Sequence, residues 1–484
     1  MNDLKNRNLT MLTDFYEITM ANGYLLNGKG NTLTQFDMFF REVPDNGGFA
    51  IMAGVEQLAE YLDNLSFTAD DIDYLRKCGF CDEFLEYLEG FEFKCDVSCV
   101  PEGTPIFPRE PIVTVKGPAM QAQFIETMVL LAINHQSLIA TKANRIVRAA
   151  QGRPIMEFGS RRAQGFDGAV YGARAAYIAG CAGTACTITD REFGVPALGT
   201  MAHSWVQLFD SEYEAFCAYA RAYPGACTLL VDTYNVLKSG IPNAIRAFND
   251  VVIPAGFRPN GVRIDSGDIT YLSKKVRKML DEAGFEDVKI VASNSLDEYI
   301  IRDMLLQGAL VDSFGVGERL ITASSAPVFG GVYKLSAVEK NGVMEPKIKL
   351  SENTTKITIP GAKKLWRLYD RETGKAAADL ITLEDEVVDD SKPYELFDPD
   401  FTWKRKTLEN YSARELLEPL FVKGKCVYRH PDIEEIKQYC KEQVDTLWDE
   451  VLRFENPHNY YVDLSQKLWD TKYDLINSIN TKNK

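Results

Sequence analysis

A regular alternation of short apolar runs and helical stretches begins near residue 154 and constrains the fold more than any other feature of the chain. The segments between the runs, chiefly 212–223, 270–283 and 296–307, have helical character. Short buried strands separated by helices are typical of a parallel sheet, either open or closed into a barrel. The five apolar runs are Ile155–Phe158, Thr228–Val231, Gly261–Ile264, Val288–Ala292 and Val311–Val316.

Polar residues and glycines follow each of these five runs. Ligands of parallel α/β folds bind at the carboxyl ends of the strands, above the loops that follow. Solvated loops would also be polar, but they would not need to favour this one side of the sheet. The pattern therefore predicts a binding site made by five segments: Gly159–Arg162, Asp232–Tyr234, Asp265–Asp268, Ser293–Ser295 and Gly315–Gly317.

One of only four histidines lies in a turn of small residues, Gly199–Ser204. Gly199 and Ala202 leave room for a ligand near the backbone, and Thr200 offers a hydroxyl. An imidazole can accept a proton or a phosphoryl group near neutral pH. We therefore predict that His203 is catalytic, although a structural or surface histidine would fit the hexapeptide alone.

The chemistry of the strand ends suggests a phosphorylated sugar as ligand. Asp265 and Asp268 can accept hydrogen bonds from vicinal hydroxyls or hold Mg²⁺ through water. Arg161 and Arg162 offer planar guanidinium groups to phosphate oxygens. The Gly315–Gly317 turn presents N–H groups to a phosphate with no Cβ in the way.

The 484 residues suggest two or three domains. We expect an N-terminal α/β domain over 1–140, an α/β barrel over 141–335, and a region over 336–484 that packs back on the N-terminal domain. Within these we expect a helix from Thr13 to Tyr24, a strand over Leu33–Arg41 and a helix over 121–150. The last part should hold a strand over Lys347–Leu350, an acidic loop over 384–390 and a helix over 433–454.

A net charge of −15 argues against a broad nucleic-acid surface. No apolar run approaches the roughly 18–20 residues of a membrane span, so we expect a cytoplasmic protein that binds no membrane. The spacing of Cys78 and Cys81, followed by Cys95 and Cys99, raises the question of zinc. Half-buried thiols are the simpler interpretation, because Cys95 and Cys99 share one face of a strand-like run.

Six motifs together resemble the nicotinate phosphoribosyltransferase family, a type II phosphoribosyltransferase family. They follow one another over residues 9–335, and weaker similarity surrounds Asn456–His458 and Val462–Ser465. The six motifs are Thr13–Tyr16, Glu157–Arg162, Gly199–Ser204, Leu230–Tyr234, Gly261–Asp268 and Gly330–Leu335.

The resemblance implies an irregular α/β barrel with a second α/β domain, and a homodimer whose active sites lie at the subunit interface. It implies that nicotinate and 5-phosphoribosyl 1-diphosphate give nicotinate mononucleotide and pyrophosphate in NAD salvage, coupled to ATP hydrolysis, with Mg²⁺ accompanying the diphosphate. His203 would be the residue that ATP phosphorylates, with Arg263 and Asp265 also catalytic.

The same resemblance implies the substrate contacts. Tyr16, from the other subunit, and Phe158 would sandwich the pyridine ring, while Thr200 and Arg263 would bind its carboxylate. The phosphoribosyl diphosphate would contact Arg161, Asp265, Ser293, Asn294, Gly315 and Gly317.

One residue departs from the family pattern, because Glu318 follows the phosphate turn where many relatives have threonine. A carboxylate beside a phosphate is unfavourable unless it is paired, and we expect Arg319 to be its partner.

Three alternatives stay open at the sequence level. A nicotinamide or quinolinate phosphoribosyltransferase differs only in the substituents that the pocket must bind. A catalytically idle barrel that serves as a binding protein would make the strand-end charges expendable. A metal-dependent hydrolase is disfavoured, because the His-x-His spacing typical of such barrels is missing.

Overall fold

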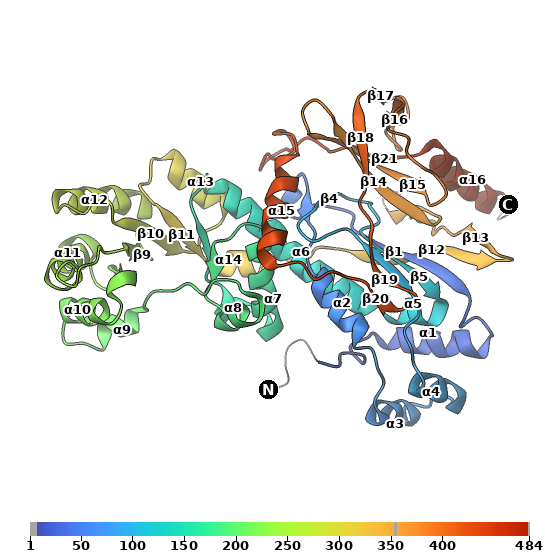
Figure 1. Cartoon of the computed structure of the whole chain (residues 1–484), viewed down its shortest axis with the longest axis horizontal. Coiled ribbons are helices and arrows are strands. Elements are labelled where there is room, and N and C mark those ends of the chain that lie inside the picture. The colour runs from blue at the N-terminus through green and yellow to red at the C-terminus, as the bar shows by residue number, and fades with distance from the viewer. Residues whose placement is uncertain (1–6, 353–355, 483–484) are drawn as a thin grey trace. The chain divides into compact units, whose positions relative to one another are not determined.

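The computed structural model describes residues 7–352 and 356–482. The chain divides into two compact units, which Figure 1 shows in chain-order colours. One unit holds residues 1–138 and 328–484, and the other holds residues 139–327. The helix α6 (Glu126–Ala149) runs across the first division. Each unit is described by itself below.

The middle unit is built on six parallel strands in the order β7-β6-β11-β10-β9-β8. Five of them overlap the five predicted apolar runs, with β10 extending two residues past its run to Asn294, and the mixed α/β class is confirmed. The end strands of the ladder are β7 and β8. The six strands are β6 (Ile155–Glu157), β7 (Gly183–Thr184), β8 (Thr228–Leu230), β9 (Gly261–Ile264), β10 (Lys289–Asn294) and β11 (Ser313–Val316).

Helices follow the strands of this unit. The predicted helices are confirmed as α10, α12 and α13, and Asp268 and Asp297 cap the last two by accepting backbone N–H groups with their carboxylates. Two π-helical turns, Val236–Gly240 and Phe248–Val252, flank α11. The helices are α7 (Gly165–Ile178), α8 (Thr187–Phe193), α9 (His203–Gln207), α10 (Glu212–Ala222), α11 (Ile241–Ala247), α12 (Ile269–Glu282), α13 (Glu298–Leu306) and α14 (Glu318–Ile321).

The other unit contains a seven-stranded antiparallel sheet in the order β13-β12-β1-β5-β3-β19-β20. Its three middle strands, β1, β5 and β3, come from the N-terminal part of the chain, and strands from the C-terminal part flank them, since β12 pairs with β1 and β19 pairs with β3. The strands are β1 (Leu33–Phe39), β3 (Asp96–Cys99), β5 (Val113–Pro118), β12 (Val332–Lys340), β13 (Val343–Pro346), β19 (Glu418–Val422) and β20 (Lys425–Cys426).

A second sheet of this unit has the order β18-β14-β15-β21, and two short pairs, β2–β4 and β16–β17, accompany it. These strands are β2 (Ala50–Ile51), β4 (Pro105–Ile106), β14 (Lys363–Asp370), β15 (Ala376–Leu383), β16 (Tyr394–Phe397), β17 (Arg405–Leu408), β18 (Tyr411–Glu415) and β21 (Val462–Leu464). The helices are α1 (Phe15–Leu26), α2 (Val55–Asp63), α3 (Ala69–Lys77), α4 (Asp82–Glu89), α5 (Ala119–Phe124), α15 (Ile433–Asp445) and α16 (Gln466–Lys482).

Three predicted elements differ from the structure. The helix expected over 121–150 is broken at Ile125 into α5 and α6, because the amide of Thr127 donates to the Glu17 carboxylate. The strand expected over Lys347–Leu350 lies earlier, at β13, because Asn341 and Gly342 both have positive φ and form the tight turn of a hairpin with β12.

The helix expected over 433–454 ends at Asp445. The ammonium group of Lys375 donates to the carbonyl oxygens of Asp445 and Leu447, both at 2.8 Å. The amide of Ala376 donates to the carbonyl of Thr446 at 2.9 Å. The carbonyl oxygens at the end of α15 therefore accept hydrogen bonds from Lys375 and from the first residue of β15. These bonds replace those of a further helical turn, and the helix ends.

Candidate active site

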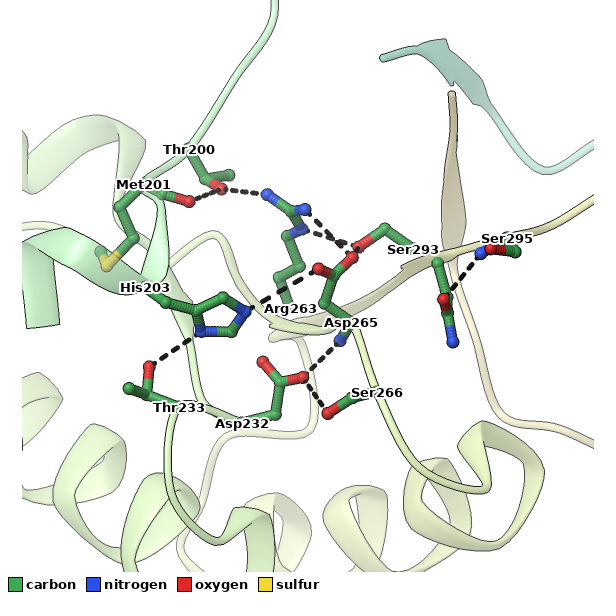
Figure 2. A network of polar contacts seen from close by, with 11 residues as sticks. Thr200, Met201, His203, Asp232, Thr233, Arg263, Asp265, Ser266, Ser293 and Ser295 are labelled. Atoms are coloured by element: carbon green, nitrogen blue, oxygen red, sulfur yellow. Dashed lines mark hydrogen bonds and ion pairs between the residues drawn. The ribbon is translucent and has the colours of Figure 1, made fainter. Parts of the chain in front are cut away.

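His203 lies at the first position of α9, directly after the small-residue turn, and 42% of its side chain is exposed. Its Nδ1 atom is 3.1 Å from the hydroxyl oxygen of Thr233, and its Nε2 atom is 3.9 Å from a carboxylate oxygen of Asp265 (Figure 2). The imidazole is therefore held at one nitrogen and directed toward an acidic group at the other. It is not a core histidine.

Arg263 joins three of the predicted site residues. Its guanidinium donates from Nε to Ser293 Oγ at 2.8 Å, from Nη1 to Thr200 Oγ1 at 3.2 Å and from Nη2 to Asp265 Oδ1 at 3.2 Å (Figure 2). Because these partners come from β10, the turn before α9 and the end of β9, one side chain fixes three segments.

Asp232 supports Asp265 from the neighbouring strand end. One carboxylate oxygen of Asp232 accepts the Asp265 amide at 3.0 Å and the Ser266 hydroxyl at 2.6 Å (Figure 2). The other oxygen is buried and has no hydrogen-bond partner. Asp232 begins the predicted strand-end segment Asp232–Tyr234, but the sequence assigned it no role of its own; it lies two residues after the end of β8, whereas Asp265 directly follows β9.

Phe158 follows β6, and its ring fills the space beside a glycine of β11. A Cβ atom on Gly315 would lie 2.5 Å from Phe158 Cδ2, so only glycine fits there. The Arg263 guanidinium carbon is 5.6 Å from the centre of the Phe158 ring. An aromatic face and a cation thus meet at one place, as a flat anionic ligand requires.

Glu157 anchors the turn that carries Phe158 and the two arginines, and sequence reasoning missed it. Its buried carboxylate accepts hydrogen bonds from the Gly159 amide and, at 2.6 Å, from the Thr184 hydroxyl. Burial raises the pKa of Glu157, and these two bonds oppose that rise. The neighbours of Glu157 in the sequence are apolar and give no local signal that its carboxylate supports this turn.

The residues predicted to bind phosphate occupy three strand ends. Arg161 is exposed in a single 3-10 turn, Ser160–Arg162, and Gly317 directly precedes α14. Ser293 donates its hydroxyl hydrogen to Asp265. Asn294 has a φ of 142°, a strained value for a residue with a side chain, and such strain is frequent at functional sites.

The predicted pairing of Glu318 with Arg319 is wrong. Arg319 pairs with Asp297, the residue that caps α13. Glu318 lies 3.6 Å from the Nε atom of Arg162 instead. The partners differ from the prediction because the first turn of α14 directs neighbouring side chains to different sides.

Tyr16, the remaining predicted site residue, belongs to the other unit. It lies in the first turn of α1, and 44% of it is exposed. The other predicted site residues all belong to the middle unit.

Asp268, which could hold Mg²⁺ through water, and the cysteines for which zinc was considered less simple than half-buried thiols have the following surroundings. The Asp268 carboxylate caps α12, accepting the Tyr271 amide at 3.0 Å. Cys95 and Cys99 are buried at β3, which raises the pKa of both thiols, whereas Cys78 is exposed at the end of α3. Among the described residues, no group of three or more His, Cys, Asp or Glu side chains could hold a metal ion.

Fold and site together define an α/β protein that gathers a histidine, an arginine and two aspartates at the carboxyl edge of a parallel sheet. Family models match most of the chain: the nicotinate phosphoribosyltransferase N-terminal domain over residues 11–134, the nicotinate phosphoribosyltransferase family over 154–373 and the C-terminal domain over 362–472. The chain belongs to the nicotinate phosphoribosyltransferase family.

Individual proteins agree with this assignment. The chain is 43% identical to nicotinate phosphoribosyltransferase of Bacillus subtilis (strain 168), over 99% of this chain and 97% of that protein. The crystal structure of human nicotinic acid phosphoribosyltransferase is 29% identical with a TM-score of 0.85, covering 96% of this chain and 99% of that one. The nicotinate-nucleotide pyrophosphorylase of Pyrococcus furiosus shares the fold, at 23% identity with a TM-score of 0.69 over 92% and 97% of the two chains.

Proposed function

We propose that this chain catalyses the ATP-coupled joining of nicotinate to 5-phosphoribosyl 1-diphosphate. The products are nicotinate mononucleotide and pyrophosphate, with ADP and phosphate from ATP and water. The observation that carries the proposal is the cluster of His203, Arg263 and Asp265 at the carboxyl ends of the parallel strands. Family membership supports the same reaction.

Nicotinate would lie flat on Phe158 with its carboxylate at Arg263 and Thr200. The guanidinium carbon of Arg263 lies 5.6 Å from the centre of the Phe158 ring, which supports this arrangement because a ligand stacked on that ring would have its carboxylate within reach of Arg263. Tyr16, from the partner subunit, would cover the opposite face of the pyridine. The protein would therefore act as a homodimer with shared sites.

The phosphoribosyl diphosphate would occupy the neighbouring strand ends. Asp265 would accept hydrogen bonds from the ribose hydroxyls, while Arg161, Ser293 and Asn294 would contact phosphate oxygens. The backbone of Gly315 and Gly317 would contact phosphate there, with the Phe158 ring filling the space where a Cβ atom of Gly315 would stand. Breaking the bond from ribose C1 to the diphosphate creates positive charge on the sugar, which the Asp265 carboxylate stabilises.

Mg²⁺ bound with the diphosphate would neutralise the charge of the departing pyrophosphate. The donor set fits this ion, because Asp232 has a buried carboxylate oxygen without a partner and carboxylate oxygens are preferred by hard cations. Asp232 and Asp265 would hold the ion through water, with no direct protein ligation implied.

ATP would donate its γ-phosphoryl group to His203. A bond forms between an imidazole nitrogen and phosphorus, the bond from phosphorus to the β,γ-bridging oxygen breaks, and ADP leaves. Water later cleaves the nitrogen–phosphorus bond and releases phosphate. The phosphorylated imidazole adds negative charge beside Asp265, which can organise the Mg²⁺ and the diphosphate.

We also infer an irregular barrel for the middle unit and a cytoplasmic location. Within the described residues, every helix is too short or too polar to cross a bilayer.

Nicotinamide and quinolinate are the competing substrates. Nicotinamide lacks the carboxylate that Arg263 would pair with, and quinolinate would need a second cationic partner for its second carboxylate.

A pyrophosphate-release assay on the purified protein tests the proposal. Nicotinate, nicotinamide and quinolinate are each offered with 5-phosphoribosyl 1-diphosphate and Mg²⁺, with and without ATP. We expect the highest kcat/KM for nicotinate and an increase when ATP is present. Faster release with nicotinamide or quinolinate would identify the alternative substrate, and no release with any of them would favour a binding protein.

A further inference from the structure

A buried carboxyl group in the first turn of α1 has a set of partners that no step of the reaction uses. Glu17 is fully buried, and its carboxylate accepts hydrogen bonds from the Thr13 hydroxyl, from the Thr127 amide at 3.1 Å and from the Thr127 hydroxyl at 2.6 Å. Thr13 and Thr127 are 114 positions apart in the sequence, so these bonds fasten two distant segments of one unit.

These hydrogen bonds lie at the junction between α5 and α6. The Asp14 amide donates to Thr127 Oγ1 at 3.1 Å, and the Thr13 hydroxyl lies 3.2 Å from the Phe124 carbonyl. Glu17 therefore caps the start of α6 from another helix, and the α6 dipole favours its negative charge. Burial raises the pKa of Glu17 to about 7, opposed by the bonds from Thr127 and Thr13.

Tyr16 immediately precedes Glu17 and is directed differently. Successive helical residues are about 100° apart around the axis, so a buried Glu17 leaves its neighbour at the surface. Tyr16 is 44% exposed. The pKa of its phenol is raised, mainly by partial burial and also by the nearby negative charges of Glu126 and Glu17. Glu17 thus fixes, through its hydrogen bonds, the turn of α1 from which the Tyr16 side chain projects.

We propose that Glu17, through its bonds to Thr13 and Thr127, is a positioning residue that sets the Tyr16 ring for stacking on the pyridine of nicotinate. This inference rests on the stacking role given to Tyr16 in the proposed function. Glu17 itself touches no substrate. Removing the Glu17 carboxylate should weaken nicotinate binding, and this effect should vanish when the ring of Tyr16 is absent.

A double-mutant cycle on the full-length protein tests this inference. Glu17→Ala should raise the KM for nicotinate about tenfold and change the KM for 5-phosphoribosyl 1-diphosphate less than about twofold. Glu17→Gln should stay within about threefold of wild type, because its amide oxygen can still accept from Thr127. Glu83→Ala, an exposed glutamate in the first turn of α4, is the matched control and should change neither constant.

In the Tyr16→Ala background, Glu17→Ala should raise the nicotinate KM no further. An equal increase in both backgrounds, or no increase in either, would overturn the positioning role. If Glu17→Ala does not fold, Thr127→Val tests the same bonds and should also act only when Tyr16 is present. A Tyr16→Ala enzyme with an unchanged nicotinate KM would instead refute the stacking role in the proposed function, and the inference would fail with it.

Discussion

At the scale of single residues, the site depends on a few side chains that each satisfy several partners. Arg263 binds Thr200, Asp265 and Ser293 at once, and Asp232 binds the amide of Asp265 and the hydroxyl of Ser266. A planar guanidinium with five fixed donors can serve three acceptors, whereas an ammonium group on a flexible chain cannot hold them in one geometry. The charge of Arg263 alone does not explain its role.

We therefore expect Arg263→Lys to lower kcat/KM for nicotinate by about 10- to 100-fold although the positive charge is kept. Steady-state kinetics with varied nicotinate measure this effect. Arg277→Lys is the control, because Arg277 in α12 also has three partners, Asp281 and the carbonyls of Phe285 and Val288. Unchanged kinetics for Arg263→Lys would show that charge suffices and would contradict the geometric role.

At the scale of secondary-structure elements, a side chain that follows one strand packs against a glycine of the adjacent strand near their carboxyl ends. The Phe158 amide donates to the Val316 carbonyl at 2.8 Å, which extends the pairing of β6 with β11 by one residue. The Phe158 ring then occupies the space above Gly315. The position of the predicted pyridine-stacking ring is therefore set by a glycine in the next strand.

Gly315→Ala should displace the Phe158 ring, since the added Cβ would lie 2.5 Å from it. We expect the nicotinate KM to rise by about tenfold or more, with a loss of stability of about 1–3 kcal/mol. Kinetics and thermal unfolding measure the two effects. Gly23→Ala in α1, where a Cβ would meet no atom within 4 Å, should alter neither adversely. A wild-type nicotinate KM for Gly315→Ala would contradict the packing argument.

The sequence predicted those elements whose signals are local. The strands β8 to β11 are buried apolar runs bounded by polar residues, so both their positions and their functional ends could be read directly. Strand β7 was missed because two residues, Gly183 and Thr184, carry no periodicity. The early end of α15 was missed because Lys375, on the turn before β15, terminates it.

Within the site, residue types could be predicted but partners could not. Asp265 was found because it directly follows a strand, and Arg263 because the family resemblance implies a role for it. The pairings of Glu318 with Arg162 and of Arg319 with Asp297 depend on how the turns after β6, β10 and β11 are directed in space. The positions of Glu157 and Asp232 depend equally on contacts with other strand ends. No spacing within one segment specifies such contacts.

At the scale of the whole molecule, ion pairs and carboxyl groups are buried where distant segments join. In the unit that combines the two ends of the chain, Arg367 and Asp379 form a fully buried pair, and Arg367 also donates to the Pro105 carbonyl at 2.8 Å. Asp463 of β21 is buried beside β15, and burial with the nearby charge of Asp398 raises its pKa to about 7. Such a group makes stability depend on pH.

A carboxyl group with a raised pKa in the folded state stabilises the protein at low pH and loses that contribution as pH rises. For Asp463 the loss should extend from its ordinary value of 3.8 up to about 7. Asp463→Asn removes the ionisation, so we expect the Tm of the variant relative to wild type to rise by about 2–4 °C between about pH 5 and pH 8. A Tm difference that does not vary with pH would contradict the assignment.

The most direct test of the central claim is to measure phosphate transferred from ATP to the protein. After incubation with ATP and Mg²⁺, mass spectrometry of the intact protein and its peptides should find one acid-labile phosphate, located on His203. The His203→Ala variant should carry none and should lose ATP stimulation of pyrophosphate release while keeping the Tm of wild type within about 2–4 °C. A phosphate on another residue, or ATP stimulation that survives in His203→Ala, would contradict the account.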